Sequence, residues 1–520
     1  MATASIDMFP RTGTAEIDGL LSGAYWDLGA GRTITWALGD NAEYYWLAST
    51  VPVMQAAFNA WERVIDVNFV YKGIYPMYER APADIVATVN DNRIFQYVGG
   101  TSTAGLGLWP NSASADSFVS QFGATPNSYP NPEGDIAFNL SNTLFDWVNL
   151  GSAAFHVALH EIGHAIGLKH PHDGGLAGYP TYNALGISHL DDGNLTLMSY
   201  DETSNIWQHG WSATPLPLDI MAAQRIYGAN PTTHAGDTVH YLYDDGLLQT
   251  IYDVSGNDTL NASNITISGV TLNLRSGSES TLGLLSTVFT SGRNGNGTQI
   301  ENAVGTMWGD SISGNQYNNL LKGGGGNDSM NGGAGLDVAQ YSSNKSNFII
   351  SVNYLVWTVT DIHGTEGRDT VDNIERLSFS DVNVALDIAA KPGEAYRLYK
   401  AAFDRAPDLV GLGFWINALD NGHSALDMAS EFNISPEFIS LYGANNSNDD
   451  YLNLLYNNVL DRNGDPGGHA FWLGHLNAGT VTREKLLIDF SESLENKANV
   501  VEIIANGIDY MPYGTDLILV

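Results

Sequence analysis

The sequence predicts an α+β protein that consists of a mixed α/β domain, a parallel β-roll and a mainly α-helical domain. Strand-like and helix-like segments alternate in the first part of the chain, which also carries a histidine-rich helical motif. Glycine, asparagine, serine and threonine with short β-branched runs then replace the helix formers, and a helical composition returns near the end. We therefore expect an α/β domain at 1–230, whose short amino-terminal extension could be a propeptide, a β-roll at 231–390, a helical module at 391–510 and a tail at 511–520.

The composition is that of a globular, strongly acidic chain of 520 residues. Its 57 Asp and Glu residues outnumber its 22 Lys and Arg residues, which gives a formal net charge of −35. Such a charge repels nucleic acid and attracts cations. The absence of cysteine excludes disulfide bonds and thiolate metal sites. No stretch reaches the roughly 18 consecutive apolar residues that a transmembrane helix needs.

The first long element that the pattern predicts is a helix in VPVMQAAFNAWERVI (51–65). Val53, Ala57 and Trp61 fall on one helical face, which should be buried. Pro52 suits the first turn of such a helix, because its missing N–H has no partner there. Runs rich in β-branched residues follow and predict strands at 66–71, 83–89 and 134–140.

The histidine-rich stretch HEIGHAIGLKHP lies on the next predicted helix, for which Ser152 is a suitable N-cap. Helical residues advance by about 100° each, so His160 and His164 lie one turn apart on one face. Gly167 suits the positive φ of a helix end. The chain can then turn back and bring His170 to the ion that the first two histidines would bind.

Three neutral imidazoles would leave the fourth position of a zinc ion open to water, as in catalytic zinc sites. Glu161, adjacent to the first histidine, can take a proton from that water. The alternative is that the histidines are ordinary residues of a buried helix. A bare HExxH pair does not decide between the two. The longer pattern HExxHxxGxxH favours a metal site, because each further specified position lowers the rate of chance matches.

Several other residues have ambiguous roles. His156 lies one turn before His160, but one helix cannot easily aim three histidines at an ion that a residue beyond the helix also reaches. A supporting or core role is therefore favoured for it. His172 and Asp173 could border the cleft, although simple solvent exposure is favoured. Asp258, in SGNDTL, is equally well interpreted as a calcium ligand or as a turn former.

A nine-residue unit repeats four times within the β-rich region, beginning at Gly305, Gly314, Gly323 and Gly332. The sixth residue of each unit carries a side-chain oxygen: Asp310, Asn319, Asp328 and Asp337. The eighth residue is apolar: Ile312, Leu321, Met330 and Ala339. This period is typical of a parallel β-roll that binds calcium in its glycine turns and fills its interior with the eighth residues. A flexible glycine-rich linker is the alternative, and four units in register disfavour it.

The calcium sites are expected to use the sixth residues together with backbone positions of the turns. The residues concerned are Asp310, Asn319, Gly323, Gly325, Asp328, Gly332, Asp337 and position 334, which is Ala334. Only the units that begin at Gly323 and Gly332 have the full GGxGxD pattern. Because Asn319 replaces an aspartate, the calcium sites could be fewer or weaker than usual.

A longer repeat occupies the helical region, where LYKAAFDRAPDLVGLGFWINALDNG from Leu398 matches LYNNVLDRNGDPGGHAFWLGHLNAG from Leu455. The offset is constant, so Asp404 pairs with Asp461 and Trp415 with Trp472 among other identical residues. Such a duplication predicts two similar helical units packed together. Their aromatic residues are better interpreted as core than as a cofactor site.

The motifs resemble those of a known family. His160 to His170 matches the metzincin signature, and TLMSYD from Thr196 is similar to the metzincin Met-turn, with Met198 beneath the metal and Tyr200 two residues later. Together with the glycine- and aspartate-rich RTX-type nonapeptides, these stretches resemble the serralysins, secreted zinc endopeptidases of peptidase family M10. PLDIMAAQRIYGAN from Pro217 is similar to the helix that closes the protease domain of that family.

The resemblance implies a zinc endopeptidase that hydrolyses proteins or peptides, with catalytic zinc on three histidines and several structural calcium ions. Glu161 would be the general base. Tyr200 would be a further zinc ligand in the resting enzyme and would move to the tetrahedral intermediate during the reaction. The duplicated region is not part of the usual serralysin and resembles a helical module of unknown function in bacterial secreted and surface-layer proteins.

The resemblance also implies an extracellular protein. We expect no amino-terminal signal, because MATASIDMFPRTG has neither a basic start followed by an apolar run nor a small-residue cleavage site. Serralysin-like proteins use a carboxy-terminal signal read by a one-step (type I) secretion machinery. The final TDLILV, with Asp516 followed by apolar residues, is similar to such a signal, whereas a final β-strand packed on the helical module is the alternative. The helical module could contact a cell surface or a large substrate, and we expect a monomer.

One rival function remains to be weighed, that of a surface-layer or adhesion-type calcium-binding protein whose protease domain is a vestige. The intact set of His160, Glu161, His164, His170 and Tyr200 argues against a vestige, since decay would be free to remove any of them.

Overall fold

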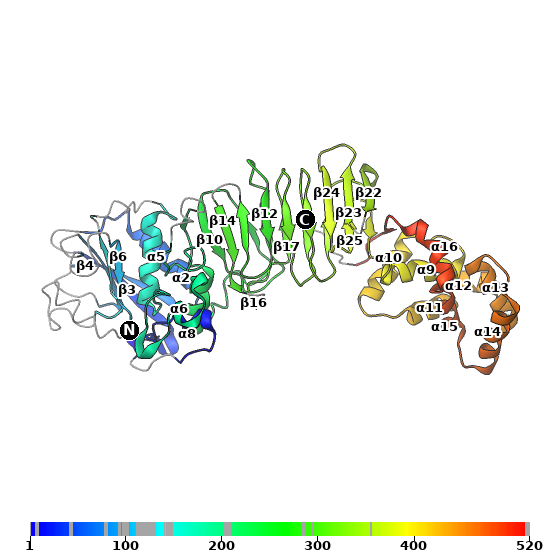
Figure 1. Ribbon diagram of the computed structural model, residues 1–520, viewed down its shortest axis with the longest axis horizontal. Coiled ribbons are helices and arrows are strands. Elements are labelled where there is room, and N and C mark those ends of the chain that lie inside the picture. The colour runs from blue at the N-terminus through cyan, green and yellow to red at the C-terminus, as the bar shows by residue number, and fades with distance from the viewer. Residues whose placement is uncertain are drawn as a thin grey trace. The chain divides into compact units, whose positions relative to one another are not determined.

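The computed structural model describes residues 2–5, 10–40, 45–76, 82–91, 95, 103–110, 132–139, 141, 149–201, 210–282, 286–293, 296–353 and 356–514. The chain forms two compact units, Met1–Asn302 and Ala303–Val520, whose helices and strands are labelled in Figure 1. The finer division at 230, 390 and 510 stays a prediction. None of the described helices is long and apolar enough to cross a lipid bilayer.

A five-stranded sheet organises the beginning of the first unit, in the order β4, β3, β5, β7, β6. The first four strands are parallel, and β6 at the edge is antiparallel to β7. The three predicted strands are confirmed as β4, β5 and β7. The bounds are β3 Thr33–Asp40, β4 Asn68–Pro76, β5 Ile85–Asn90, β6 Gly105–Gly107 and β7 Ile136–Asn139, while β1 Thr3–Ala4 pairs separately with β2 Trp26–Asp27.

Two long helices pack against each other beside this sheet, α2 (Val51–Glu62) and α5 (Ala153–Ala165) (Figure 1). The predicted helix at 51–65 is confirmed, and Val53, Ala57 and Trp61 are buried. The Trp61 indole N–H donates to the Leu159 carbonyl of α5 at 3.1 Å. Because α5 also contacts β6, the histidine-rich helix lies beside the edge strand of the sheet. The other helices of this unit are α1 Ala15–Asp18, α6 Tyr182–Leu185 and α8 Pro217–Tyr227.

The rest of the first unit is mainly strands. Strands β8, β10 and β14 are parallel neighbours, and β13 joins β14 to β12 by antiparallel pairing. Strands β9 and β11 are parallel neighbours in another sheet. The bounds are β8 Trp211–Ser212, β9 Val239–Tyr241, β10 Leu247–Ile251, β11 Thr259–Asn261, β12 Val270–Asn273, β13 Glu279–Leu282, β14 Ser286–Thr290, β15 Gly292–Arg293 and β16 Asn296–Gly297, with β17 Asn302–Val304 at the division between the units.

In the second unit each nonapeptide contributes one strand, and successive strands belong alternately to two sheets. Strands β18, β20 and β24 are parallel in one sheet, and β19, β21 and β25 are parallel in the other. The eighth residues of the nonapeptides are at most 1% exposed, as predicted. The bounds are β18 Ser311–Ser313, β19 Leu320–Lys322, β20 Ser329–Asn331, β21 Val338–Gln340, β22 Phe348–Asn353, β23 Val356–Asp361, β24 Arg368–Asp372, β25 Arg376–Ser378, β26 Asn383–Ala385 and β27 Ile508–Tyr510.

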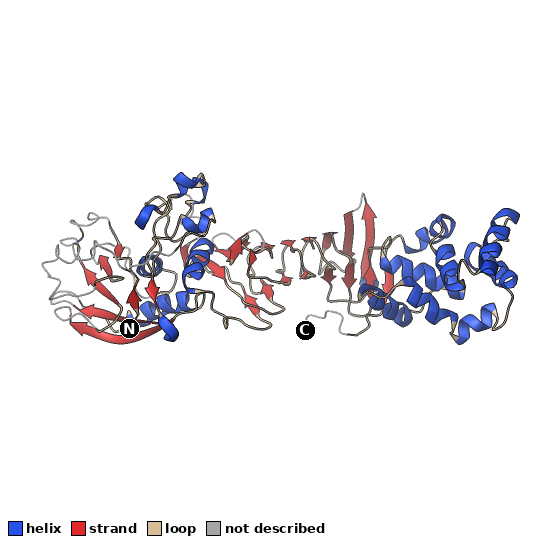
Figure 2. Cartoon of the chain, turned by 90° about the horizontal axis from the view of Figure 1, so that it is seen from below, coloured by secondary structure: helices blue, strands red, loops and turns tan. Residues whose placement is uncertain are grey.

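Eight helices follow in the described part of the second unit (blue in Figure 2). The same local devices recur in both halves of the duplication: Asp404 and Asp461 end α9 and α13 in the left-handed conformation, and Asp408 and Asp465 cap α10 and α14. Of the predicted export tail, residues 515–520 with Asp516 lie outside the described residues. The bounds are α9 Lys391–Phe403, α10 Leu409–Asp420, α11 Ala425–Asn433, α12 Pro436–Tyr442, α13 Asn448–Leu460, α14 Pro466–Ala478, α15 Arg483–Ser491 and α16 Leu494–Ile504.

Candidate metal centre

Local sequence determines where α5 begins and ends. The Ser152 hydroxyl accepts the Phe155 N–H at 3.2 Å, so Ser152 is the N-cap, as predicted. Gly167 has a φ of +107°, and a Cβ there would lie 2.3 Å from the Ala24 carbonyl oxygen. Only glycine suits this position, where the chain turns back after the helix and carries His170 towards α5.

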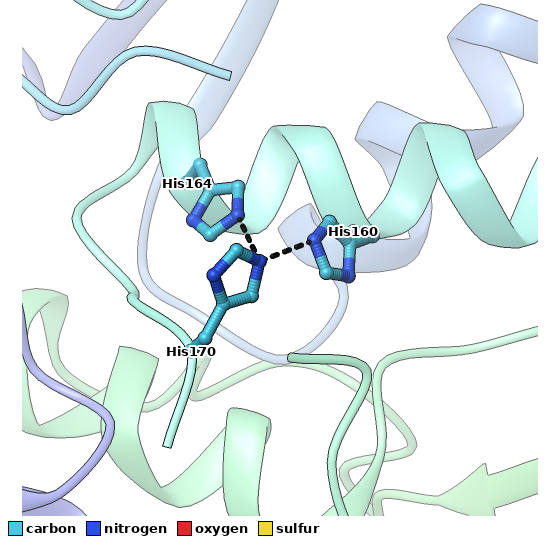
Figure 3. Close-up of side chains that lie close together, drawn as sticks. All are labelled: His160, His164 and His170. Atoms are coloured by element: carbon cyan, nitrogen blue, oxygen red, sulfur yellow. Dashed lines mark hydrogen bonds between the residues drawn. The ribbon is translucent and has the colours of Figure 1, made fainter. Parts of the chain in front are cut away.

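The structure brings His160, His164 and His170 together (Figure 3), and these three could hold one metal ion. The first two project from α5 and the third from the segment that follows. The Nε2 atom of His170 lies 3.1 Å from Nε2 of His160 and 3.0 Å from Nε2 of His164. The spacing argument made from the sequence is therefore confirmed in its geometry.

The other ring nitrogens explain why the Nε2 atoms of the two helical histidines face inward. Nδ1 of His160 lies 2.6 Å from the Leu197 carbonyl oxygen, and Nδ1 of His164 lies 2.9 Å from that of Leu168. A carbonyl oxygen can only accept, so in the neutral rings each Nδ1 carries the proton and each Nε2 keeps a lone pair for a metal ion.

Burial keeps the imidazoles of His160 and His164 neutral. It lowers the pKa of His164 to about 3, and it lowers that of His160 well below its usual value, with the neighbouring histidines acting in the same direction. Neutral imidazole is the form that binds metal ions. The donor set therefore fits zinc, with three inward-facing nitrogens and an outer hydrogen bond on each of the two helical histidines.

Glu161 lies between this cluster and the edge strand β6. Its side chain is buried, and its Oε2 atom has no hydrogen-bond partner within the described chain. Burial raises the pKa of Glu161 to about 8, opposed by a hydrogen bond from the Gly107 backbone. A Cβ at Gly105 would lie 2.5 Å from Oε1 of Glu161, and a Cβ at Gly107 would lie 2.6 Å from the Glu161 carbonyl oxygen. Neither glycine was predicted to be functional from the sequence. Their only sequence signal is that glycine alternates with an apolar residue in GLG, as successive residues of a strand alternate between its two faces.

The predicted Met-turn lies directly against α5. Met198 is fully buried, and a Cβ at Gly163 of the helix would lie 2.8 Å from its Cε. Tyr200 is 62% exposed, and its ring centroid lies 4.3 Å from that of His170 and 5.9 Å from that of His160. The tyrosine is thus adjacent to the cluster and open to an incoming ligand.

Comparison with known proteins agrees with this geometry. Residues 112–201 match the matrixin family of M10 peptidases. Serralysin of Photorhabdus luminescens is 37% identical over 181 residues, which cover 31% of this chain and 36% of that protein. Metallopeptidase AprA of Pseudomonas marginalis is 36% identical over 185 residues, which cover 31% of this chain and 38% of that protein. The amino-terminal region is a serralysin-like metzincin domain.

The similarity covers only part of this chain and only part of each relative. This chain spans less than two fifths of the length of these relatives. Serralysin of Proteus mirabilis is similar over a comparable part of its length, with 34% identity over 189 residues that cover 33% of this chain and 38% of that protein. Residues 429–500 match a family described as a domain of unknown function, DUF4214.

Asp219 is a buried residue of the serralysin-like domain that sequence analysis missed. Its carboxylate accepts the backbone N–H groups of Leu197 (2.7 Å) and Leu216 (3.1 Å) and the Thr196 hydroxyl. Burial raises the pKa of Asp219 to about 7, while these hydrogen bonds lower it. Asp219 thereby fixes the turn whose Leu197 carbonyl orients His160. Its only sequence signal is an acidic residue in the first turn of α8, after Pro217.

The histidines with ambiguous roles are now placed. His156 is buried, lies 5.3 Å from the Trp211 ring centroid and does not belong to the His160 cluster, so a supporting role stays the favoured interpretation. The His172 ring stacks on that of His170 at 5.1 Å. The Asp173 carboxylate accepts the Nδ1–H of His170 at 2.7 Å, a contact that lowers the pKa of Asp173, and so orients the third histidine. Both His172 and Asp173 are exposed, as expected, and Asp173 in addition contacts the third histidine.

The sixth residues of the nonapeptides form hydrogen-bonded ladders. Asp328 Oδ1 accepts the Asp310 backbone N–H at 2.8 Å, and Asp369 Oδ1 accepts that of Asp328 at 2.9 Å. In the other sheet Asp337 Oδ1 accepts the Asn319 N–H at 2.7 Å. The second oxygens of Asp328 and Asp337 are buried and have no hydrogen-bond partner in the described residues. They are free to face a cation.

Two acidic residues extend these ladders beyond the nonapeptide array, Asp369 and Glu375, whose Oε2 accepts the Asp337 N–H at 2.8 Å. Sequence analysis missed both, because they fall outside the nine-residue period. The signal for Asp369 is Gly367 two residues earlier. Burial raises the pKa of Asp328 to about 8 and those of Asp337 and Asp369 to about 7.

The first glycine of each nonapeptide packs against the sixth residue of its own unit. A Cβ at Gly323 would lie 2.0 Å from Asp328 Oδ2, and one at Gly332 would lie 2.4 Å from Asp337 Oδ2. In the last two units the residues at the second and fourth positions are glycines with positive φ: Gly324, Gly326, Gly333 and Gly335. The glycine at the first position is thus needed for space, and those at the second and fourth positions for backbone conformation.

Proposed function

We propose that the chain is a secreted, zinc-dependent endopeptidase that hydrolyses peptide bonds of proteins. The observation that carries this proposal is the convergence of three imidazoles beside a buried glutamate, one of whose carboxylate oxygens has no hydrogen-bond partner among the described residues. The rival function, a surface-layer or adhesion-type protein with a vestigial protease domain, is not favoured, because His160, Glu161, His164, His170 and Tyr200 lie together.

Zinc would be held by His160, His164 and His170, and when bound it supplies a polarised substrate carbonyl and a water of lowered pKa. Glu161 accepts the proton of the attacking water and then donates it to the leaving nitrogen. A carboxylate whose pKa lies near neutrality suits both steps. Tyr200, as a further zinc ligand at rest, would donate its hydroxyl proton in a hydrogen bond to the oxyanion.

The edge strand β6 supports a peptide as the substrate. It is the last strand of its sheet in the described chain, and an extended peptide can add to such an edge through backbone hydrogen bonds. Gly105 and Gly107 leave β6 without side chains where it meets Glu161. A substrate backbone on this strand would therefore pass beside the general base.

The nonapeptide region would be a calcium-binding β-roll. The predicted ligands are Asp310, Asn319, Asp328 and Asp337 with turn positions Gly323, Gly325, Gly332 and Ala334. The second carboxylate oxygens of Asp328 and Asp337 support this proposal, since they are buried and have no hydrogen-bond partner among the residues that the structure describes. An uncompensated buried charge is costly, and calcium prefers oxygen ligands.

An extracellular site of action is supported by the acidic, cysteine-free composition, which suits a chain that folds on meeting calcium. We further propose that a one-step (type I) machinery exports the chain through the tail at 511–520. The helical module would contact a cell surface or a large substrate, and the protein would be a monomer.

The substitution Glu161→Gln tests the function directly. It should retain zinc and lower peptide hydrolysis by at least about 10²- to 10⁴-fold, the usual range for general acid–base catalysis. Glu431→Gln on exposed surface of α11 is the matched control and should hydrolyse peptide normally. Hydrolysis at the wild-type rate by Glu161→Gln would remove Glu161 from the reaction. A wild-type protein that lacks chelator-sensitive hydrolysis would favour the rival function.

A further inference from the structure

Lys169, the residue directly before the third histidine, has a long basic side chain that is fully buried. Lysine is almost never buried in this way unless its amine is paired. Here the Nζ amine donates to two backbone carbonyl oxygens, that of Gly19 and, at 3.2 Å, that of His170. Lys169 and Gly19 are 150 residues apart in the sequence. The side chain therefore links the amino-terminal part of the chain to the third histidine.

His170 is the member of the triad that lies outside α5. The hydrogen bonds of the helix fix the backbone of His160 and His164, whereas His170 follows the turn at Gly167. Its position therefore depends on the contacts that the segment after the helix makes with other parts of the chain.

Residues 19–22, which we call the amino-terminal segment, pair with the chain that leads from Gly167 to His170. The Ser22 N–H donates to the Gly167 carbonyl at 3.0 Å, and the Ser22 hydroxyl donates to the same oxygen at 2.6 Å. The backbone N–H of Lys169 donates to the carbonyl of the amino-terminal segment at position 20 at 2.8 Å. Backbone pairing and the Lys169 amine thus act on the same short stretch.

The amino-terminal segment also supports the second histidine of the triad. Leu21 and Leu168 form an antiparallel bridge. The Leu168 carbonyl oxygen in turn lies 2.9 Å from Nδ1 of His164 and so orients that ring. Two of the three imidazoles therefore depend on residues that pair with the amino-terminal segment.

Tyr182 holds the amino-terminal segment by close packing. A Cβ at Gly19 would lie 2.1 Å from the Tyr182 ring, so glycine is required there for space. The Tyr182 hydroxyl donates to the Glu16 carbonyl at 2.8 Å, and its backbone N–H donates to the Pro171 carbonyl at 2.8 Å. The same tyrosine therefore contacts both the amino-terminal part of the chain and the residue after His170.

An ordinary core position would not favour lysine at residue 169. Burying an amine costs free energy, which its hydrogen bonds return only in part. An apolar side chain would fill the same space without this cost. What the amine adds is the link between the carbonyl oxygens of Gly19 and His170.

We propose that Lys169 is a positioning residue of the candidate zinc site, and that it couples the amino-terminal segment to the third histidine. The amino-terminal segment is then a permanent part of the metal centre. This inference rests on the zinc site of the proposed function, although not on peptide hydrolysis. It also limits any propeptide, whose removal would have to leave Gly19 and the residues after it in place.

The test is the zinc affinity of the folded, calcium-loaded full chain, measured by competition with a chromophoric chelator. Lys169→Met nearly keeps the length of the side chain and removes the amine. It should lower zinc affinity about 10- to 100-fold, the usual effect of losing an outer support of a metal ligand.

Arg32→Met is the matched control. Arg32 belongs to the same unit and also donates to two backbone carbonyl oxygens, those of Asp66 at 2.6 Å and of Tyr227. It contacts neither the triad nor the amino-terminal segment through these bonds. Its loss should lower the melting temperature and leave zinc affinity unchanged, which separates general destabilisation from an effect on the site.

Chemical rescue separates the amine from the filling of space. The natural chain has no cysteine, so Lys169→Cys carries a single thiol that can be alkylated in denaturant before refolding with calcium. Aminoethylation restores an amine at nearly the length of lysine and should recover most of the lost zinc affinity. Ethylation adds no donor and should not. The visible absorption of bound cobalt, which reports ligand geometry, should follow the same order.

Three results would overturn the positioning role: wild-type zinc affinity in Lys169→Met, equal rescue by both alkyl groups, or a zinc-loaded mature protein of wild-type affinity whose chain begins after Gly19. Amino-terminal sequencing of the mature protein checks the last of these. A wild type that binds no zinc would instead overturn the proposed function, and this inference with it.

Discussion

The histidines of the candidate metal centre and the aspartates of the nonapeptides are buried to a similar extent, yet burial acts on their charges in opposite directions. His160 and His164 are 7% and 6% exposed, and Asp328 and Asp337 are 2% and 0% exposed. Desolvation disfavours the charged form of every group, so it lowers the pKa of His164 to about 3 and raises that of Asp328 to about 8.

The histidine triad therefore has its metal-binding form without an ion, whereas the nonapeptide aspartates need a cation to compensate their buried charge. A neutral imidazole with a hydrogen-bonded Nδ1 is already the ligand that zinc needs, so α5 can hold the triad in place without metal. A buried carboxylate must instead take up a proton or a cation. We therefore expect calcium to affect the nonapeptide region far more than the serralysin-like domain.

The largest expected effect is that of removing calcium at pH 8. Since the carboxyl pKa values are raised in the calcium-free folded state, that state binds more protons than the unfolded chain between about pH 4 and pH 8. Its stability should fall as the pH rises through this window. Calcium at 100 times its Kd should restore about 2.7 kcal/mol per site. Calorimetric melting between pH 5 and 8, with and without calcium, measures both trends.

The double variant Asp328→Asn with Asp337→Asn is the control for this comparison. Without calcium its melting temperature should change less between pH 5 and pH 8 than that of wild type, because two of the titrating groups are gone while Asp369 remains. A calcium-free wild type that becomes more stable towards pH 8 would contradict the assignment of these carboxylates.

The next effect concerns the glycines beside Glu161. Gly107→Ala would place Cβ 2.6 Å from the Glu161 carbonyl oxygen and 2.7 Å from His164 Cβ, so strand and helix must move apart. Displacements of about 1 Å at a catalytic group can cost about 10²-fold in rate. Peptide hydrolysis should fall by that order, while the calcium response of melting stays normal. Gly174→Ala, with nothing within 4 Å of its Cβ, is the control; equal activities would show that β6 yields freely.

The glycines beside Glu161 could not be predicted from the sequence, whereas several other features could. The triad, the Ser152 cap and the turn at Gly167 follow from local geometry, because helical spacing and φ preferences act within one or two turns. The buried eighth residues follow from a fixed period. Such patterns determine contacts between neighbours along the chain, and the structure confirms them.

Contacts between distant segments had no such pattern. Asp219 reaches Leu197 across 22 residues, and Asp369 reaches Asp328 across 41 residues after the nonapeptide period has ended. Gly107 is required only because α5 packs on β6. A single acidic residue or glycine is compatible with many roles, and only the packing of the elements selects one.

A smaller effect is expected for Tyr200→Phe. The ring contacts with His170 and His172 should persist, and only the hydroxyl is lost. If that hydroxyl acts on the oxyanion, kcat should fall by about 10²-fold, the lower end for removal of one such donor, and KM should change less. Zinc content should stay constant. Tyr45→Phe, on another exposed tyrosine, is the control. An unchanged kcat would leave Tyr200 a structural residue.

The smallest effect is expected where one nonapeptide already departs from the pattern. Asn319 is fully buried, its Oδ1 accepts the Asn315 N–H at 2.8 Å and its Nδ2 donates to Asn315 Oδ1 at 3.2 Å. Asn319→Asp removes that donor and adds a buried charge. Without calcium it should lower the free energy of unfolding by about 1–3 kcal/mol, the cost of an unsatisfied buried group. With calcium the variant should instead be more stable than wild type, because the carboxylate is a stronger calcium ligand than the amide.

The control is Asn318→Asp, which is exposed and one residue earlier and should change stability little in either condition. Melting of both variants with and without calcium decides the matter, and a shift of the same sign in both conditions would mean that no cation reaches Asn319.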